Sequence, residues 1–117
     1  MMHAKKNRTL GRSRSQRTAL LRGLVVSLIR DGQITTTLAK AKEVQPTVER
    51  LETHAKTDNV AARRHVASKL GEPQDVTIQK LFTEIAPKFA EREGGYTRVI
   101  KLGQTGGRQE AVIEFVA

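Results

Sequence analysis

The sequence predicts an α+β fold: a helix, a strand, three helices and a two-stranded hairpin that together form a small three-stranded mixed sheet packed against helices. Two observations predict it. Apolar residues recur at spacings of three and four between Leu21 and Ile85, and the pattern changes to alternation after Gly94-Gly95. At 117 residues the chain supports one compact core, so we expect an arm over residues 1–14 and a single domain over residues 15–117.

The first helix is expected to begin near Ser15, a good N-cap residue, and to end at Gly32. One face of this helix is apolar and consists of Leu21, Leu24, Val25, Leu28 and Ile29. The segment from Gln33 to Thr37 is rich in β-branched residues and too short for a helix. It is therefore predicted to be a strand.

Three more helices follow, each with recognisable start and stop residues. They are expected over Leu38 to about Lys56, from Asp58 as N-cap to Leu70, and from near Asp75 to Pro87. Pro46 lies inside the first of them and lacks a backbone N–H, so we expect it to kink or split that helix.

The last third is predicted to be an antiparallel hairpin with a glycine-rich loop over residues 103–109. One strand is expected to bury a face made of Tyr96, Ile100 and Leu102, and the other a face made of Ala111, Ile113 and Phe115.

The net charge is +9, and all of it lies in the first 42 residues, which contain ten basic residues and only Asp31 as an acid. After Lys42 the basic and acidic residues balance. A protein surface that only needs to be soluble mixes its charges, whereas a basic block at one end is typical of nucleic-acid binding.

The arm has the composition that phosphate binding requires. Arginine outnumbers lysine between Lys5 and Arg17, and a guanidinium holds two phosphate oxygens at once. Ser13 and Ser15 add neutral donors that suit phosphate and ribose oxygens. Leu10 is the only large apolar residue between His3 and Thr18, so we expect the arm to order only on RNA.

The sequence predicts no enzyme and no cofactor. It contains no cysteine, and the three histidines His3, His54 and His65 are not spaced as metal ligands. The glycines of residues 103–107 lead into a strand and lack the Gly-Lys-Ser/Thr that would make a phosphate-binding loop. No apolar run approaches the length that spans a bilayer, so we expect no membrane contact.

The four aromatic residues are Phe82, Phe89, Tyr96 and Phe115. Proteins that read single-stranded RNA stack bases on exposed aromatic rings, and too few rings remain here once a core is filled. We therefore expect recognition through the phosphate backbone and the shape of the RNA.

Several strings, taken in order along the chain, resemble the bacterial large-subunit ribosomal protein seventeen family. They are Arg8 to Arg12, the helix Arg17 to Ile29, Gln33 to Glu43, the pair Arg63-Arg64, Lys80 to Pro87 and Gly94 to Arg98. The combination of Ile-Thr-Thr-Thr with Gly-Gly-Tyr-Thr-Arg is specific to that family.

The resemblance implies a monomer that binds large-subunit ribosomal RNA near the outer end of the peptide exit tunnel. It implies neighbouring ribosomal proteins as partners, a cytoplasmic location and no small-molecule substrate. It also implies that the arm enters RNA and that residues 35–42 and 96–98 face it. The residues expected to bind RNA are His3, Lys5, Lys6, Arg8, Arg12, Ser13, Arg14, Ser15, Arg17, Arg22, Thr35, Thr36, Thr37, Lys40, Lys42, Arg63, Arg64, Tyr96, Thr97 and Arg98.

The sequence departs from the family pattern at Met2, Ala4 and the loop Gln104-Thr105-Gly106, which is commonly more basic. Two other classes of function compete with the ribosomal one. A free-standing nucleic-acid-binding or chromosome-organising protein would use the same arm on DNA, but no helix-turn-helix or dimerisation heptad supports it. An RNA-modifying or RNA-cleaving enzyme would need a general base or a metal cluster, and none is apparent.

Overall fold

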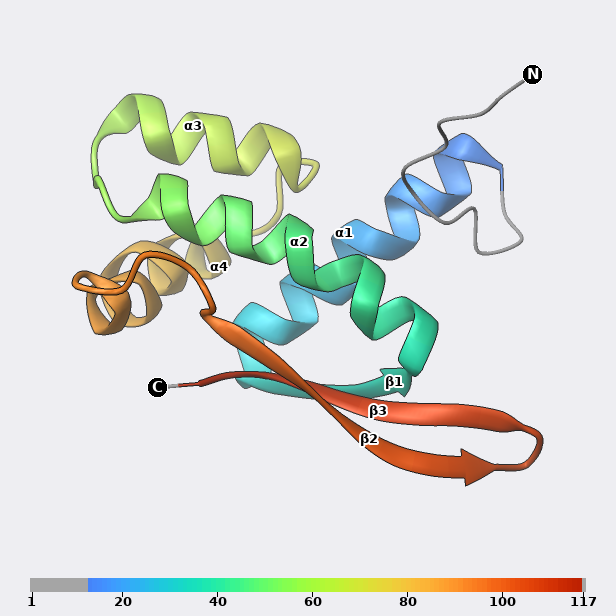
Figure 1. Cartoon of the computed structure of the whole chain (residues 1–117). Helices are drawn as coiled ribbons and strands as arrows, with labels where there is room; N and C mark the ends of the chain where they lie inside the picture. The colour runs from blue at the N-terminus through green and yellow to red at the C-terminus, as the bar shows by residue number, and fades with distance from the viewer. Residues whose placement is uncertain (1–12, 117) are drawn as a thin grey trace, which may run out of the picture.

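The computed structural model describes residues 13–116. Its elements are α1 (Arg14–Asp31), β1 (Gln33–Thr37), α2 (Leu38–Ala55), α3 (Val60–Lys69), α4 (Asp75–Lys80), a π-helical segment (Leu81–Ile85), a 3-10 turn (Ala86–Phe89), β2 (Thr97–Thr105) and β3 (Arg108–Phe115). The predicted order of helices and strands is confirmed, and with it the α+β class (Figure 1).

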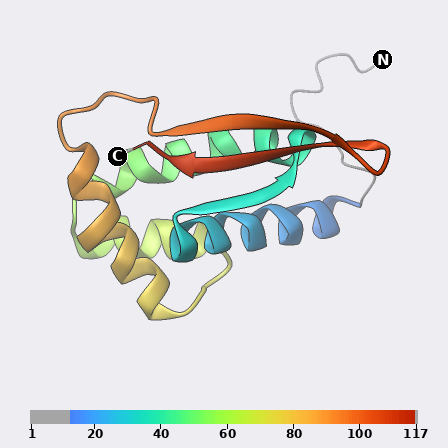
Figure 2. The same ribbon diagram turned by 90° about the horizontal axis from the view of Figure 1, so that it is seen from below.

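The three strands form one sheet in the order β1-β3-β2, and both pairs are antiparallel. The expectation of a mixed sheet is wrong, because β3 lies between β1 and β2 and runs opposite to both. α2 crosses one face of the sheet and contacts all three strands, while α1 lies beside β1. Within the described residues no helix covers the other face, which is turned toward the viewer in Figure 2.

α1 begins earlier than expected. Its N-cap is Ser13, whose side chain accepts a hydrogen bond from the N–H of Gln16, and the Gln16 side chain accepts one from the N–H of Ser13. This reciprocal capping box satisfies two backbone donors, which Ser15 would not do with Thr18 at the third position. Ser13 and Arg14, which were assigned to the arm, are the cap and the first residue of α1. The helix ends as predicted at Gly32, which has a φ of 82°.

α2 continues through Pro46 as one helix, so of the expected kink or split the split does not occur. Pro46 lies on the exposed side, and the residues that flank it on the opposite side, Val44 and Val48, are fully buried. Packing of that face against the sheet stabilises the helix on both sides of Pro46 despite the missing hydrogen bond.

The next two helices differ from expectation at their ends. Asn59, not Asp58, caps α3, and its side chain accepts from the N–H of Ala62 at 2.7 Å. The helical path after α4 does not stop at Pro87, because the chain tightens into a 3-10 turn that has proline at its start. Proline is tolerated at the start of a helical turn, where its missing N–H has no partner to lose.

The hairpin exposes two residues that were expected inside. Ile100 is 42% and Leu102 is 53% exposed. Tyr96 is buried but precedes β2, so the alternation of the strand begins at Thr97 and puts Thr97 and Val99, not Ile100, toward the core. A bulge between Lys101 and Gly103 then shifts the register. The expected loop over residues 103–109 is a tight turn at Gly106 and Gly107, whose φ values of 61° and 86° suit a two-residue hairpin.

A single core joins the helices to the sheet. Phe89 and Tyr96 lie at its centre with ring centroids 5.3 Å apart, and Phe115 packs on Phe89 at 6.1 Å. The fully buried aliphatic residues around them include Val25, Leu28, Ile29, Val44, Val48, Val66, Leu81 and Ile113.

Candidate nucleic-acid interface

Five of the residues expected to bind RNA lie outside the described residues. These are His3, Lys5, Lys6, Arg8 and Arg12. The others lie on the folded domain, and the structure distributes them over several separate surfaces.

The start of α1 forms a hollow of about 580 Å³. It is lined by Ser13, Arg14, Ser15, Thr18 and Arg22. The first turn of the helix contains no acid, although the positive end of a helix dipole favours negative charge. Arg14 and the half-buried Arg17 add positive charge at the same place. The hollow therefore suits an anion such as a phosphate group.

The start of α2 repeats this arrangement in a groove of about 370 Å³. The groove is lined by Thr37, Leu38, Ala39, Lys42, Arg108 and Gln109. Thr37 caps the helix by accepting a hydrogen bond from the N–H of Lys40, and again the first turn has no acid. Lys42 is exposed and Lys40 is half-buried.

Sequence reasoning missed Arg108 and Gln109, which it placed in a loop. The register of β1 against β3 pairs Thr37 with Glu110, and this pairing brings the start of β3 next to the first turn of α2. Only a prediction of that long-range register could have found them.

The hollow and the groove lie at the same end of the molecule. The starts of α1 and α2 and the tip of the hairpin are all at this end in Figure 1 and in Figure 2. We call the hollow and the groove together the basic end. It gathers arginine and lysine from three elements and adjoins the position where residues 1–12 join the domain.

Arg63 and Arg64 lie on a different surface, beside α4. They line a cleft of about 400 Å³ with Asp75 and other residues. Arg63 is already paired, because its Nε and Nη2 donate to the two carboxylate oxygens of Asp58 at 2.7 and 2.9 Å, and its guanidinium lies 5.3 Å from the ring centroid of Phe82. The hydrogen bonds from Arg63 lower the pKa of Asp58. Arg64 is exposed.

Thr35 and Arg98 share the uncovered face of the sheet. The register sets Thr35 opposite Val112 and Arg98 opposite Glu114. The Arg98 Nε donates to Glu114 at 2.7 Å, so its charge is partly compensated. Thr36 faces the opposite side, next to the buried Ala111.

Tyr96 and Thr97, which the family resemblance assigns to RNA binding, are buried in the domain. Their exposed fractions are 2% and 5%. The Thr97 hydroxyl donates to Glu49 at 2.8 Å, and the Tyr96 hydroxyl lies 3.4 Å from that of Thr53. Tyr96 packs on Phe89 and Thr97 is bonded to Glu49 of α2, so both side chains are engaged inside the domain.

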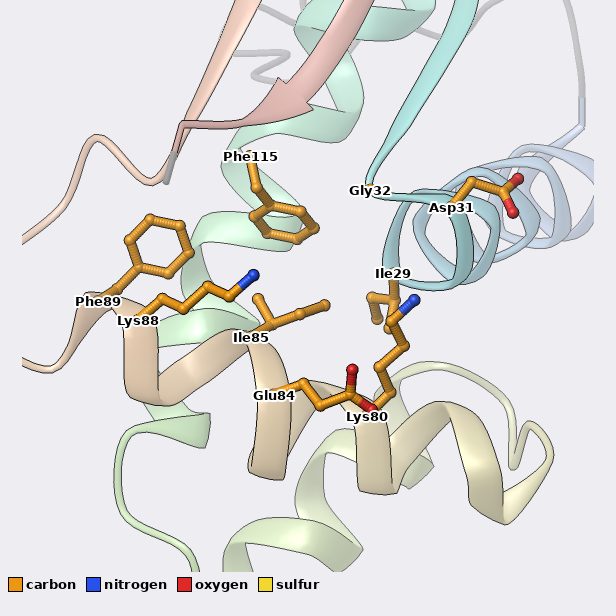
Figure 3. A pocket seen from close by; sticks show the side chains of 9 residues that line it. All are labelled: Ile29, Asp31, Gly32, Lys80, Glu84, Ile85, Lys88, Phe89 and Phe115. Carbon is orange, nitrogen blue, oxygen red and sulfur yellow. The ribbon is translucent and has the colours of Figure 1, made fainter.

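A pocket of about 270 Å³ lies between the end of α1, the helical turns after α4 and β3. Figure 3 shows Ile29, Ile85 and Phe115 turned into it, with Asp31, Lys80, Glu84 and Lys88 around them. The Lys80 ammonium donates to the carbonyl oxygen of Arg30 at 2.6 Å and so fixes one wall. The pocket offers apolar side chains and mixed charges, without a nucleophile beside a base.

Within residues 13–116 no group of three or more histidine or acidic side chains could hold a metal ion. None of the helices in this described part is long and apolar enough to cross a membrane.

The model of one protein family, described as ribosomal protein L17, matches residues 20–116. The chain belongs to the ribosomal protein L17 family. This is a family of ribosomal proteins and not of enzymes, and the resemblance inferred from the sequence strings is confirmed.

Individual members of the L17 family match most of the chain. "Large ribosomal subunit protein bL17" of Shouchella clausii is 51% identical, with 92% of this chain and 96% of the relative covered. The protein of the same name from Exiguobacterium sibiricum is 48% identical over the same shares. That of Dictyoglomus thermophilum is 46% identical over 99% of this chain and 100% of the relative. This last match extends over the basic arm.

Proposed function

We propose that this protein is a structural constituent of the large ribosomal subunit and binds large-subunit ribosomal RNA through the arm and the basic end. Membership of the L17 family supports the ribosomal role and a cytoplasmic location in the ribosome. The family resemblance also supports a place near the opening of the peptide exit tunnel, next to other large-subunit proteins, with one copy in each subunit.

The observation that best supports RNA binding is the position of the positive charge in the sequence and in the fold. All of the net charge lies in the first 42 residues, and the fold sets the two helix starts within that stretch at one end of the molecule. Neither first turn contains an acid. Phosphate groups of RNA would supply the negative charge that both helix starts lack.

The contacts are made to the RNA backbone and not by base stacking. Phe89 and Tyr96 are buried, Phe82 is 3% exposed, and Phe115 packs against the core. The phenylalanine and tyrosine rings of the described residues are therefore engaged in the core and do not form a stacking surface. Arginine, lysine, serine and threonine remain as donors, which suit phosphate and ribose oxygens.

Sedimentation tests the ribosomal role directly. Native protein from cells is separated on a sucrose gradient, and we expect one copy to migrate with each large subunit. Migration with chromosomal DNA or with the free-protein fraction would support the free-standing nucleic-acid-binding protein instead. Binding of purified protein to large-subunit RNA and to duplex DNA of equal length then tests the preference for RNA.

A further inference from the structure

A basic cleft of about 370 Å³ lies between α2 and α3, away from the hollow and the groove of the basic end. It is lined by Thr47, Arg50, Leu51, His54, His65 and Lys69. Arg50 and His54 are one turn apart on α2, and His65 and Lys69 are one turn apart on α3. Residues at this spacing share a helix face, so each helix presents two basic side chains to the other.

The two imidazole rings touch across the cleft. The ring centroids of His54 and His65 are 4.3 Å apart, and the rings are tilted by 45°. Both side chains are exposed, as are Arg50 and Lys69. No carboxylate lines the cleft within the described residues. The positive charges of Arg50 and Lys69 therefore have no acidic partner in the lining, and a bound anion would supply one.

The chemistry of the lining suits a phosphate group in particular. A guanidinium offers paired donors to two phosphate oxygens, and lysine adds a compact charge. Each imidazole presents at least one N–H donor, whether it is neutral or protonated. The hydroxyl of Thr47 adds a neutral donor at the same edge of the cleft.

The cleft connects to the basic end through Arg22. The Arg22 Nε donates to the carbonyl oxygen of Lys69 at 3.0 Å, so a residue of the α1 hollow touches the end of α3. Its side chain passes over Gly71, where a Cβ would lie 3.3 Å from the Arg22 Cδ. A run of basic residues therefore leads from Arg14 through Arg22 to the cleft.

We propose that the α2–α3 cleft is a second phosphate-binding site, which holds the backbone of the same RNA that occupies the basic end. This inference rests on the proposed function. A polynucleotide fits the arrangement better than a free anion does, because Arg22 of the hollow contacts Lys69 of the cleft and one backbone could follow both. Arg50 and Lys69 supply the charge, and His54 and His65 supply donors between them.

The test compares two full-length variants that each lose two exposed positive charges. Arg50→Gln with Lys69→Gln removes the charge of the cleft, and Lys88→Gln with Arg92→Gln is the matched control on another surface. Affinity for large-subunit RNA fragments is measured across a salt series, after melting curves establish that both variants fold. We expect the slope of log affinity against log salt to flatten by about one to two in the cleft variant and by less than about half a unit in the control. Equal flattening overturns the inference.

The ring resonances of His54 and His65 provide an independent readout. We expect both resonances to move when the RNA fragment is added to the wild type, and no movement overturns the site. Inorganic pyrophosphate should need far higher concentrations than the fragment. Tighter binding of pyrophosphate would overturn the assignment to a polynucleotide.

Failure of the proposed function gives a different result. In that case the wild-type protein itself would bind large-subunit RNA no better than duplex DNA, and it would not migrate with the large subunit. If only the inference about the cleft is wrong, the wild-type protein keeps both of these properties. The salt slopes of the cleft variant and the control variant then flatten equally.

Discussion

Glu49 holds Thr97 by two hydrogen bonds to one carboxylate oxygen. The Glu49 Oε2 accepts from the backbone N–H of Thr97 at 2.9 Å and from its hydroxyl at 2.8 Å. The other oxygen accepts from the N–H of Gly95 at 3.1 Å. A single side chain of α2 thus fastens the start of β2, and it uses the threonine that the family resemblance assigned to RNA.

Replacing Glu49 should therefore destabilise the fold. We expect Glu49→Ala to lower the free energy of unfolding by about 2–3 kcal/mol, because it leaves two backbone N–H groups and a hydroxyl without their charged acceptor. Urea denaturation followed by circular dichroism measures the loss. Glu84→Ala, at an exposed position, is the control and should change stability by less than about 0.5 kcal/mol. A similar loss in both variants would contradict the role of Glu49.

Thr97→Ala tests the same contact from the other side. We expect it to cost about 1 kcal/mol of stability, the usual value of a side-chain hydrogen bond, and to leave affinity for large-subunit RNA unchanged. A clear fall in RNA affinity in a variant that still folds would show that the threonine reaches RNA after all.

Glu52 makes stability depend on pH. It is fully buried, and neither carboxylate oxygen has a hydrogen-bond partner within the described residues. Burial raises the pKa of Glu52 from 4.5 to about 7, although the charge of Lys56 opposes the shift. The folded state therefore holds the proton more tightly than the unfolded chain does.

The free energy of unfolding should consequently fall as the pH rises through this range. Glu52 lowers the free energy of unfolding by at most about 1.4 kcal/mol for each pH unit, between roughly pH 5 and 7. We expect Glu52→Gln to remove this pH dependence. The difference in unfolding free energy between variant and wild type should therefore be more favourable to the variant at pH 8 than at pH 5. Urea denaturation at several pH values measures the difference. A constant difference between the two proteins would exclude the effect.

Two glycines of α1 should respond to alanine with opposite signs. Gly23 lies inside the helix, and a Cβ there would meet nothing within 4 Å. Gly32 ends the helix in the left-handed region, and its N–H donates to the carbonyl of Leu28 at 2.8 Å. We expect Gly23→Ala to stabilise by about 0.5–1 kcal/mol and Gly32→Ala to destabilise by about 1 kcal/mol. Thermal melting compares the two, and shifts of the same sign would refute the assignment of the helix end.

The arm and the first turn of α1 should together dominate the electrostatic part of RNA binding. Replacing Lys5, Lys6, Arg8, Arg12, Arg14 and Arg17 with glutamine removes six charges, and the slope of log affinity against log salt should flatten by roughly four to six. Lys88 and Arg92 serve as the control, compared per charge removed, because both are exposed and distant in sequence from the arm. Equal flattening per charge would move the binding surface onto the rest of the domain.

Local sequence signals determined where the helices lie and which class of partner is expected. The period of the apolar residues placed the helices, Gly32 marked the end of the first, and the one-sided distribution of charge indicated a polyanionic partner. These features depend on residues that are close in the chain, so the sequence alone reveals them. Ser13 was missed as the N-cap because Ser15 offered the same chemistry two residues later, and only the capping box with Gln16 decides between them.

The tertiary structure decided what depends on distant residues. The position of β3 between the other strands made the sheet antiparallel, and the register of β1 against β3 brought Arg108 to the start of α2. The burial of Tyr96 follows from its packing on Phe89, and the exposure of Ile100 from the strand phase that begins at Thr97. The basic cleft exists only because α2 and α3 pack with two histidines in contact. Sequence spacing cannot predict such contacts, because they depend on how separate elements bury their apolar faces against one another.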